Sequence, residues 1–213
     1  MTYLRLLDEQ LRRRGLARSV LLVQSNGGVA SIEQLAARPV NLLLSGPAAG
    51  VGALNLYRAA AGTDDLISME IGGTSCDVLL MSAATVGTRD ELYIGGYHVA
   101  TPSIDIHTIG AGGGTIAGVD SAGMLFVGPK GAGADPGPAC YGHGGTEPTV
   151  TDAQLVLGCL RPGTYAGGAL TLDLDAARDA IVNRVAIPLG IDVETAAAGI
   201  IALVEQYLLH AVE

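Results

Sequence analysis

Apolar residues fall at helical spacing in some stretches and form short continuous runs in others, which predicts an α/β fold with a mixed sheet flanked by helices. Leu4, Leu7 and Leu11 share one face of a predicted helix over residues 2–15. Further helices are expected at 31–37, 45–61, 148–160, 176–185 and 195–212. Strands are expected at 19–24, 40–44, 66–71, 76–82, 116–119 and 124–127, with another within 84–97.

The stretch LISMEIGGTSCDVLLM (66–81) carries the strongest candidate chemistry. Two apolar runs flank two glycines, two hydroxyls and a carboxylate, which predicts a β-hairpin whose turn is 72–75. Gly72 and Gly73 allow a ligand to approach the backbone, Thr74 and Ser75 supply hydroxyl donors, and Asp77 could hold a cation. An acidic residue, a spacer and Gly-Gly-Thr resemble the phosphate-binding hairpin of actin/hexokinase/Hsp70-type ATPases. An ordinary glycine-rich turn is the alternative interpretation.

A second candidate is the acidic and histidine pair that precedes another glycine run. In an extended segment Asp105 and His107 point to the same face, because side chains alternate along a strand. Such a pair can be half of a metal site, an Asp-oriented His base, or a hydrogen-bonded structural pair. The run Gly110–Gly114 supplies a second loop that could approach a ligand closely.

Three further stretches are open to a functional or a purely structural interpretation. The polar turn at 25–28 follows a predicted strand, and SGPAAG (45–50) opens a predicted helix. Residues 128–145 are rich in glycine and proline and predict an ordered loop. Cys140 and His143 lie in it, but no third group is evident for a nucleophilic dyad, so a buried structural thiol is the default.

Composition narrows the possible functions. The chain has 213 residues, 49% of them hydrophobic, and a net charge of −9 with one Phe and no Trp, which disfavours nucleic-acid binding. No apolar run reaches the roughly 18 residues of a membrane span, and no secretory signal is evident, so no membrane association is expected. Three cysteines without C-x-x-C spacing argue against disulfides or structural zinc and fit a cytoplasmic protein. Lys130 is the only lysine, and no Walker P-loop is present.

The chain resembles the hydantoinase A/5-oxoprolinase family, which includes ATP-dependent hydantoinases, oxoprolinases and the related subunits of acetone and acetophenone carboxylases. The matching segments are QSNGGVAS (24–31), RPVNLLLSGPAAGV (38–51), EIGGTSCDV (70–78), PSIDIHTIGAGGGTIAGVD (102–120), GAGADPGPACYGHGG (131–145) and PTVTDAQLVLG (148–158). The sequence departs from the family pattern at Glu70, Cys76 and Gly131, where Asp, Thr and Ser are usual. Family members also carry an earlier phosphate loop and a later nucleotide segment that this chain lacks, so it resembles a fragment of a longer protein.

The resemblance implies an actin-like (RNase H-like) ATPase lobe over 1–160, continued by a helical packing segment over 161–213. It implies ATP and Mg²⁺ as cofactors, and the Asp/His pair is a candidate for a second divalent metal such as Zn²⁺. The role of each residue is a hypothesis that goes beyond the motif match. We assign Asp77 and His107 to catalysis, Gly72, Gly73, Thr74, Ser75, Gly112 and Gly113 to the cofactor, and Asp77, Asp105 and His107 to metal, with Glu70 as a further magnesium or water ligand.

The implied activity is ATP-dependent hydrolysis of cyclic amides such as hydantoins or 5-oxoproline, in which ATP converts the amide oxygen into a phosphorylated leaving group. A hydantoinase B-like subunit or domain is the implied partner. Two alternatives stay open: an ATP-dependent carboxylase subunit of the acetone/acetophenone type, and a non-catalytic scaffold that retains the fold.

Overall fold

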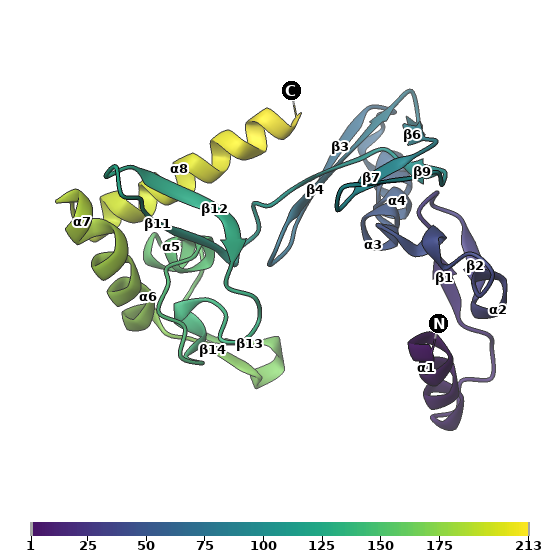
Figure 1. The fold of residues 1–213 in the computed structure, drawn as a ribbon, viewed down its shortest axis with the longest axis horizontal. Helices are drawn as coiled ribbons and strands as arrows, with labels where there is room; N and C mark the ends of the chain where they lie inside the picture. Colours follow the sequence, from purple (N-terminus) through teal and green to yellow (C-terminus); the bar gives the residue numbers. More distant parts are fainter. Residues whose placement is uncertain (1, 213) are drawn as a thin grey trace. The chain divides into compact units, whose positions relative to one another are not determined.

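The computed structural model describes residues 2–212 as a mixed α/β protein with several small sheets. It divides into two compact units (Figure 1). The first contains the chain up to Glu70 together with Val78–His107, and the second contains Ile71–Asp77 and the chain from Thr108 onward. The segment 71–77 therefore belongs to the second unit although both of its chain neighbours belong to the first.

The first unit begins with a helix and a small antiparallel strand pair. Its helices are α1 Thr2–Arg13, α2 Ile32–Leu35, α3 Ser45–Ala48 and α4 Gly50–Ala61, and β1 Leu21–Val23 pairs with β2 Val29–Ser31. Ser31 caps α2 in a capping box with Gln34, as its position in the sequence predicts. The predicted helix over 45–61 is present as α3 and α4, which follow each other directly.

The strand expected at 40–44 is wrong. Residues Pro39–Leu42 form a 3₁₀ turn (η1), and Leu44 has a left-handed backbone with φ of 54°. Pro39 occupies the first turn, where its fixed φ suits a helix start and its missing N–H is not needed. The local backbone therefore overrode the β propensity of Val40 and the leucines.

The main sheet confirms the two strands predicted around the glycines. It contains β3 Leu66–Ile71, β4 Cys76–Ser82, β5 Thr85–Val86 and β10 Ile106–Ile109, in the order β10-β4-β3 with β5 on β4. Leu79 and Met81 of β4 are buried with Leu54 of α4 in one apolar cluster. The remaining strands of the first unit form two short antiparallel pairs. These are β6 Thr88–Arg89 with β9 Ser103–Ile104, and β7 Leu92–Ile94 with β8 Tyr97–Val99.

In the second unit a strand pair packs with four helices. The pair is β11 Thr115–Val119 and β12 Leu125–Gly131, antiparallel with an irregularity between Thr115 and Ala117. The helices are α5 Val150–Val156, α6 Leu174–Ile181, α7 Ile187–Leu189 and α8 Val193–Val212, with a π-turn (η4) at Val182–Ala186. The 3₁₀ turns η2 Ala139–Tyr141 and η3 Ala166–Gly168 and the pair β13 Gly163–Tyr165 with β14 Leu170–Leu172 complete it.

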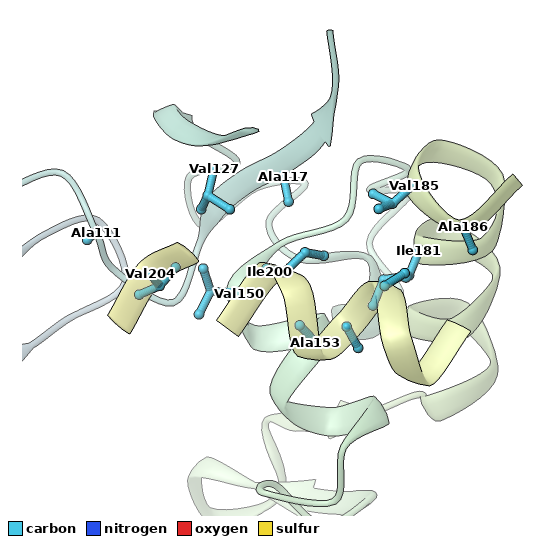
Figure 2. Packing of buried hydrophobic residues seen from close by; sticks show 12 residues of the cluster. Ala111, Ala117, Val127, Val150, Ala153, Ile181, Val185, Ala186, Ile200 and Val204 are labelled. Atoms are coloured by element: carbon cyan, nitrogen blue, oxygen red, sulfur yellow. The ribbon is translucent and has the colours of Figure 1, made fainter. Parts of the chain in front are cut away.

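Helix α8 packs one face against the core of this unit through Ala196, Ala197, Ile200 and Val204. Figure 2 shows Ile200 and Val204 of α8 among the other buried side chains, including Val150 and Ala153 of α5. The helix has a mean hydropathy of 1.4 and is long and apolar enough to cross a membrane by length and composition. Glu194, Glu205 and His210 interrupt the apolar residues of this helix, and a core helix of a soluble protein passes the same test, so the result is weak evidence for a membrane span.

Candidate functional site

The connection between β3 and β4, Gly72–Ser75, is called the glycine turn below. It is closed by one hydrogen bond, in which the Gly72 amide donates to the Ser75 carbonyl at 2.8 Å. Within residues 2–212, no acceptor takes a hydrogen bond from the amides of Gly73, Thr74 or Ser75. A Cβ at Gly73 would meet no atom within 4 Å. The turn therefore offers three consecutive amides without a protein acceptor, with open space beside Gly73, whereas the Thr74 nitrogen lies close to Gly112. Unpaired consecutive amides suit an anion.

Asp77 lies two residues beyond the glycine turn and is held by a neighbour. The hydroxyl of Thr108, at the beginning of the second unit's longer segment, donates to Asp77 Oδ1 at 2.6 Å. This bond fixes the carboxylate, and Asp77 remains partly exposed. Mg²⁺ is commonly held by one or two carboxylates together with substrate phosphates and water, so a single oriented Asp beside the amide donors fits that ion.

The glycines that precede β11 make close contact with the glycine turn. The amide of Gly113 donates to the Gly72 carbonyl at 2.9 Å, and that of Gly114 donates to the Gly73 carbonyl at 2.6 Å. A Cβ at Gly112 would lie 2.7 Å from the Gly72 carbonyl oxygen, and one at Gly114 would lie 2.8 Å from the Gly73 carbonyl oxygen. The glycine run thus allows two backbones to meet. Ligand contact by Gly112 and Gly113 remains a prediction.

Helix α5 secures this loop from the other side. The amide and the hydroxyl of Thr151 both donate to the Gly113 carbonyl, at 2.8 and 2.9 Å. The N-cap of α5 is Thr149, which forms a capping box with Asp152. A chain of bonds therefore runs from the first turn of α5 through Gly113 to Gly72.

Asp152 is a buried carboxylate that the sequence motifs do not single out. It is fully buried and accepts hydrogen bonds from the Thr149 amide and hydroxyl at 2.8 Å, and from the amides of Ala139 and Cys140 at 3.2 and 2.8 Å. Four donors satisfy the buried charge, so it anchors the glycine- and proline-rich loop to α5. The signal in the sequence is the Thr149–Asp152 spacing of a capping box.

Cys140 is a buried thiol, as the sequence analysis expects. The side chain is fully buried. Burial raises the pKa of the Cys140 thiol, and the nearby Asp152 carboxylate raises it further. His143 is exposed, and its ring lies edge-on to that of Tyr141, with 6.4 Å between the centroids. The thiolate needed for nucleophilic chemistry is therefore disfavoured.

The acidic and histidine pair lies in the first unit and has separate surroundings. Asp105 forms an ion pair with Arg89, and its amide donates to the Gly87 carbonyl. Ile106 is buried between Asp105 and the exposed His107, as strand alternation predicts. Nowhere in residues 2–212 do three His, Cys, Asp or Glu side chains gather so that they could hold a metal ion. A metal at Asp105 and His107, with a third ligand from elsewhere, therefore stays a prediction, as does the separate magnesium role of Asp77.

Glu70, the acidic residue before the Gly-Gly-Thr sequence, lies against helix α4. A Cβ at Gly50, the first residue of α4, would overlap the Glu70 carboxylate. A carboxylate near a helix N-terminus is stabilised by the unpaired amides there. A magnesium or water role for Glu70 remains a prediction.

A cavity of about 500 Å³ opens beside the glycine turn, and every residue that lines it belongs to the second unit. Backbone of Gly72, Gly73 and Gly113 forms one side. The opposite side comes from α5 and α8, which reach it from more than 75 residues along the chain. The segment after residue 160, where the sequence suggests no chemistry, therefore supplies a cavity wall.

Comparison with known proteins gives this arrangement a context. The family model described as hydantoinase/oxoprolinase matches residues 1–213, and the chain belongs to that family. It is 44% identical over 202 residues to caprolactamase subunit alpha of Pseudomonas jessenii, covering 95% of this chain and 29% of that protein. It is 38% identical over 210 residues to the acetophenone carboxylase gamma subunit of Aromatoleum aromaticum, covering 96% and 28%.

A solved structure shows the same backbone arrangement. The ATP-dependent caprolactamase of Pseudomonas jessenii superposes with a TM-score of 0.80 at 41% identity, over 99% of this chain and 30% of that one. The chain thus spans about three tenths of the length of these relatives. Its core is confirmed as a hydantoinase/oxoprolinase core, as the motifs predicted.

Proposed function

We propose that this chain supplies the phosphate-binding part of an ATP-dependent enzyme that hydrolyses cyclic amides. The observation that carries the proposal is the glycine turn, where three consecutive unpaired amides and two hydroxyls lie beside an oriented carboxylate, Asp77. The amides of Gly73, Thr74 and Ser75 would hold phosphate oxygens, and Asp77 would hold Mg²⁺ together with those oxygens. Bound Mg²⁺ would neutralise charge on the transferred phosphoryl group. An actin-like ATPase fold for the complete protein belongs to the same proposal.

The activity follows from the chemistry of amides. A cyclic amide resists attack by water because its C–N bond is resonance-stabilised, and phosphorylation of the amide oxygen would turn it into a leaving group. A relative that matches nearly all of this chain is described as an ATP-dependent caprolactamase, which supports a lactam substrate. The positions of Asp105 and His107 leave their catalytic and metal roles as predictions without a contact to support them.

A carboxylase is the second candidate, and a specific similarity favours it. The acetophenone carboxylase gamma subunit matches 96% of this chain. The same ATP site would then phosphorylate an enol oxygen instead of an amide oxygen. Several relatives are named as subunits, which supports a partner subunit, and we propose a hydantoinase B-like one in the cytoplasm.

The test is ATP hydrolysis by the full-length protein together with its partner subunit. Hydantoin, an unsubstituted lactam and 5-oxoproline are compared with acetophenone or acetone plus bicarbonate. Stimulation by a cyclic amide, with ring opening, supports the proposal. Stimulation by the ketones alone favours the carboxylase. No stimulation by any of these compounds would overturn both and leave a scaffold role.

A further inference from the structure

Two of the three unpaired amides of the glycine turn have their direction fixed by the carbonyls that precede them. In a planar trans peptide the C=O and the following N–H point in opposite directions, and the peptide bonds here are trans. The Gly72 carbonyl accepts a hydrogen bond from the Gly113 amide. The Gly73 carbonyl accepts one from the Gly114 amide. The N–H groups of Gly73 and Thr74 therefore point away from the amides that hold these carbonyls.

The same argument applies one peptide plane further back. The carbonyl of Gly113 and the N–H of Gly114 belong to one plane, and this N–H donates to the Gly73 carbonyl at 2.6 Å. The Gly113 carbonyl accepts two bonds from Thr151, from its amide at 2.8 Å and from its hydroxyl at 2.9 Å. A continuous line of hydrogen bonds thus leads from Thr151 through two peptide planes to the N–H of Thr74. Aligned hydrogen bonds polarise one another, which strengthens the last donor of the line.

A second line reaches the neighbouring amide and does not include helix α5. The Thr115 amide donates to the Gly112 carbonyl at 3.0 Å. That carbonyl shares its peptide plane with the Gly113 N–H, which donates to the Gly72 carbonyl at 2.9 Å and so orients the N–H of Gly73. Only backbone groups take part in these two bonds. The second line therefore gives an internal reference for a side-chain change made on the first.

The Thr151 side chain is held closely against the Gly113 peptide. A Cβ at Gly113 would lie 2.7 Å from the Thr151 hydroxyl oxygen. Thr151 is half-buried, and the capping box of Thr149 with Asp152 fixes the first turn of α5 that carries it. The hydroxyl is thus placed by the helix before any ligand arrives.

We propose that Thr151 is a positioning residue of the phosphate-binding turn. Its hydroxyl fixes the peptide between Gly113 and Gly114, and through that peptide it sets the direction and donor strength of the Thr74 N–H. The inference rests on the proposed function and assigns part of its nucleotide affinity to a residue outside the glycine turn. The hydroxyl proton is committed to Gly113, so Thr151 acts through the backbone and not by contact with phosphate.

The experiment uses the full-length protein with its partner subunit and measures the Kd of Mg·ATP by equilibrium binding. Thr151→Val removes the hydroxyl but keeps the side-chain shape and the backbone amide. We expect it to raise the Kd at least about threefold, as for loss of one hydrogen bond, and Thr151→Ser to restore the wild-type value. The matched control is Thr195→Val in the first turn of α8, because the Thr195 hydroxyl donates to Asp192 at 2.7 Å, outside this line. The control should leave the Kd unchanged.

Hydrogen–deuterium exchange resolved to single residues separates positioning from a general loss of stability. In the protein without nucleotide, Thr151→Val should speed exchange of the Gly114 amide at least about threefold, because the hydroxyl no longer restrains its peptide plane. The Gly113 amide belongs to the second line, so its exchange should stay at the wild-type rate.

The outcomes separate this inference from the function beneath it. An unchanged Kd in Thr151→Val, or a Kd that Thr151→Ser does not restore, overturns the positioning role and leaves the proposed function standing. Equal acceleration of exchange at Gly113 and Gly114 also overturns it, since that pattern shows a loop loosened as a whole. If the wild-type protein binds no Mg·ATP, the proposed function fails and this inference fails with it.

Discussion

The two glycine runs of the second unit look alike in the sequence but differ in their surroundings. Around Gly73 there is open space where a side chain would begin, and the neighbouring amides are unpaired. Around Gly112 and Gly114 that space is filled by the backbone of the glycine turn itself. The first run exposes donors to a ligand, and the second allows two loops to pack. Glycine enrichment alone therefore does not distinguish a loop with unpaired amides from a loop that packs backbone against backbone.

Asp152 joins the loop at Ala139 and Cys140 to helix α5, which in turn holds Gly113. Of the substitutions considered, loss of the Asp152 carboxylate should lower stability most. We expect Asp152→Ala to lower the free energy of unfolding by about 3–5 kcal/mol, because four donors lose a buried, charged acceptor. Denaturant unfolding of the 213-residue chain measures this. Asp179→Ala, at an exposed position of α6, is the matched control. Equal stability of the two variants would show that the buried network does not anchor the loop.

The glycine runs can be compared directly by adding one methyl group to each. Gly112→Ala places a Cβ within 2.6 Å of Thr74 backbone atoms, so we expect a loss of about 1–3 kcal/mol from overpacking. Gly73→Ala meets no atom within 4 Å and should change stability by less than about 0.5 kcal/mol. Thermal unfolding of both variants gives the contrast. A larger loss of stability in Gly73→Ala than in Gly112→Ala would contradict the difference between the two glycine runs.

The proposed role of the glycine turn and of Asp77 is tested by measuring enzyme activity. In the full-length protein with its partner, Asp77→Asn should reduce magnesium-dependent turnover at least about tenfold, ~1.4 kcal/mol of transition-state stabilisation, with folding intact. Thr108→Val, which removes the bond to Asp77, should have a smaller effect in the same direction. Asp179→Asn serves as the control. Wild-type turnover by Asp77→Asn at low Mg²⁺ would make Asp77 a structural residue of β4.

The smallest expected effect is a difference in alkylation between exposed and buried thiols of the folded chain. Cys159 is exposed, while Cys76 and Cys140 are buried. Because the pKa of Cys140 is raised, its thiol stays protonated as the pH rises from 7 to 9, so alkylation should label Cys159 alone across that range. Mass spectrometry of peptides from the labelled, folded chain reads out each site. Labelling of Cys140 at a rate near that of Cys159 would contradict the buried network.

Sequence patterns predicted the strands and the helix cap that depend on residues a few positions apart. The strands at 66–71 and 76–82 and the Ser31 cap are where the sequence places them, because alternation and capping act over a few positions. The strand at 40–44 failed because Pro39 favoured a helical turn.

The same patterns could not predict contacts between residues that are far apart in the sequence. Thr108 reaches Asp77 across 31 positions, and Thr151 reaches Gly113 across 38. The cavity wall on α8 depends on how a core helix packs, so its residues carry no local signal of a binding role. Gly112 and Gly113 were identified as special positions, but the groups that need their small size are the backbone of the glycine turn at Gly112 and the Thr151 hydroxyl at Gly113.

The alternation of paired and unpaired amides also sets how quickly each proton is replaced by deuterium. The Gly113 and Gly114 amides are bonded to carbonyls and should exchange slowly, whereas those of Gly73, Thr74 and Ser75 lack protein acceptors and should exchange within the shortest labelling times. An anion seated on the turn would slow the second group and leave the first unchanged. The peptide spanning residues 72–75 would then report occupancy with no dye or mutation.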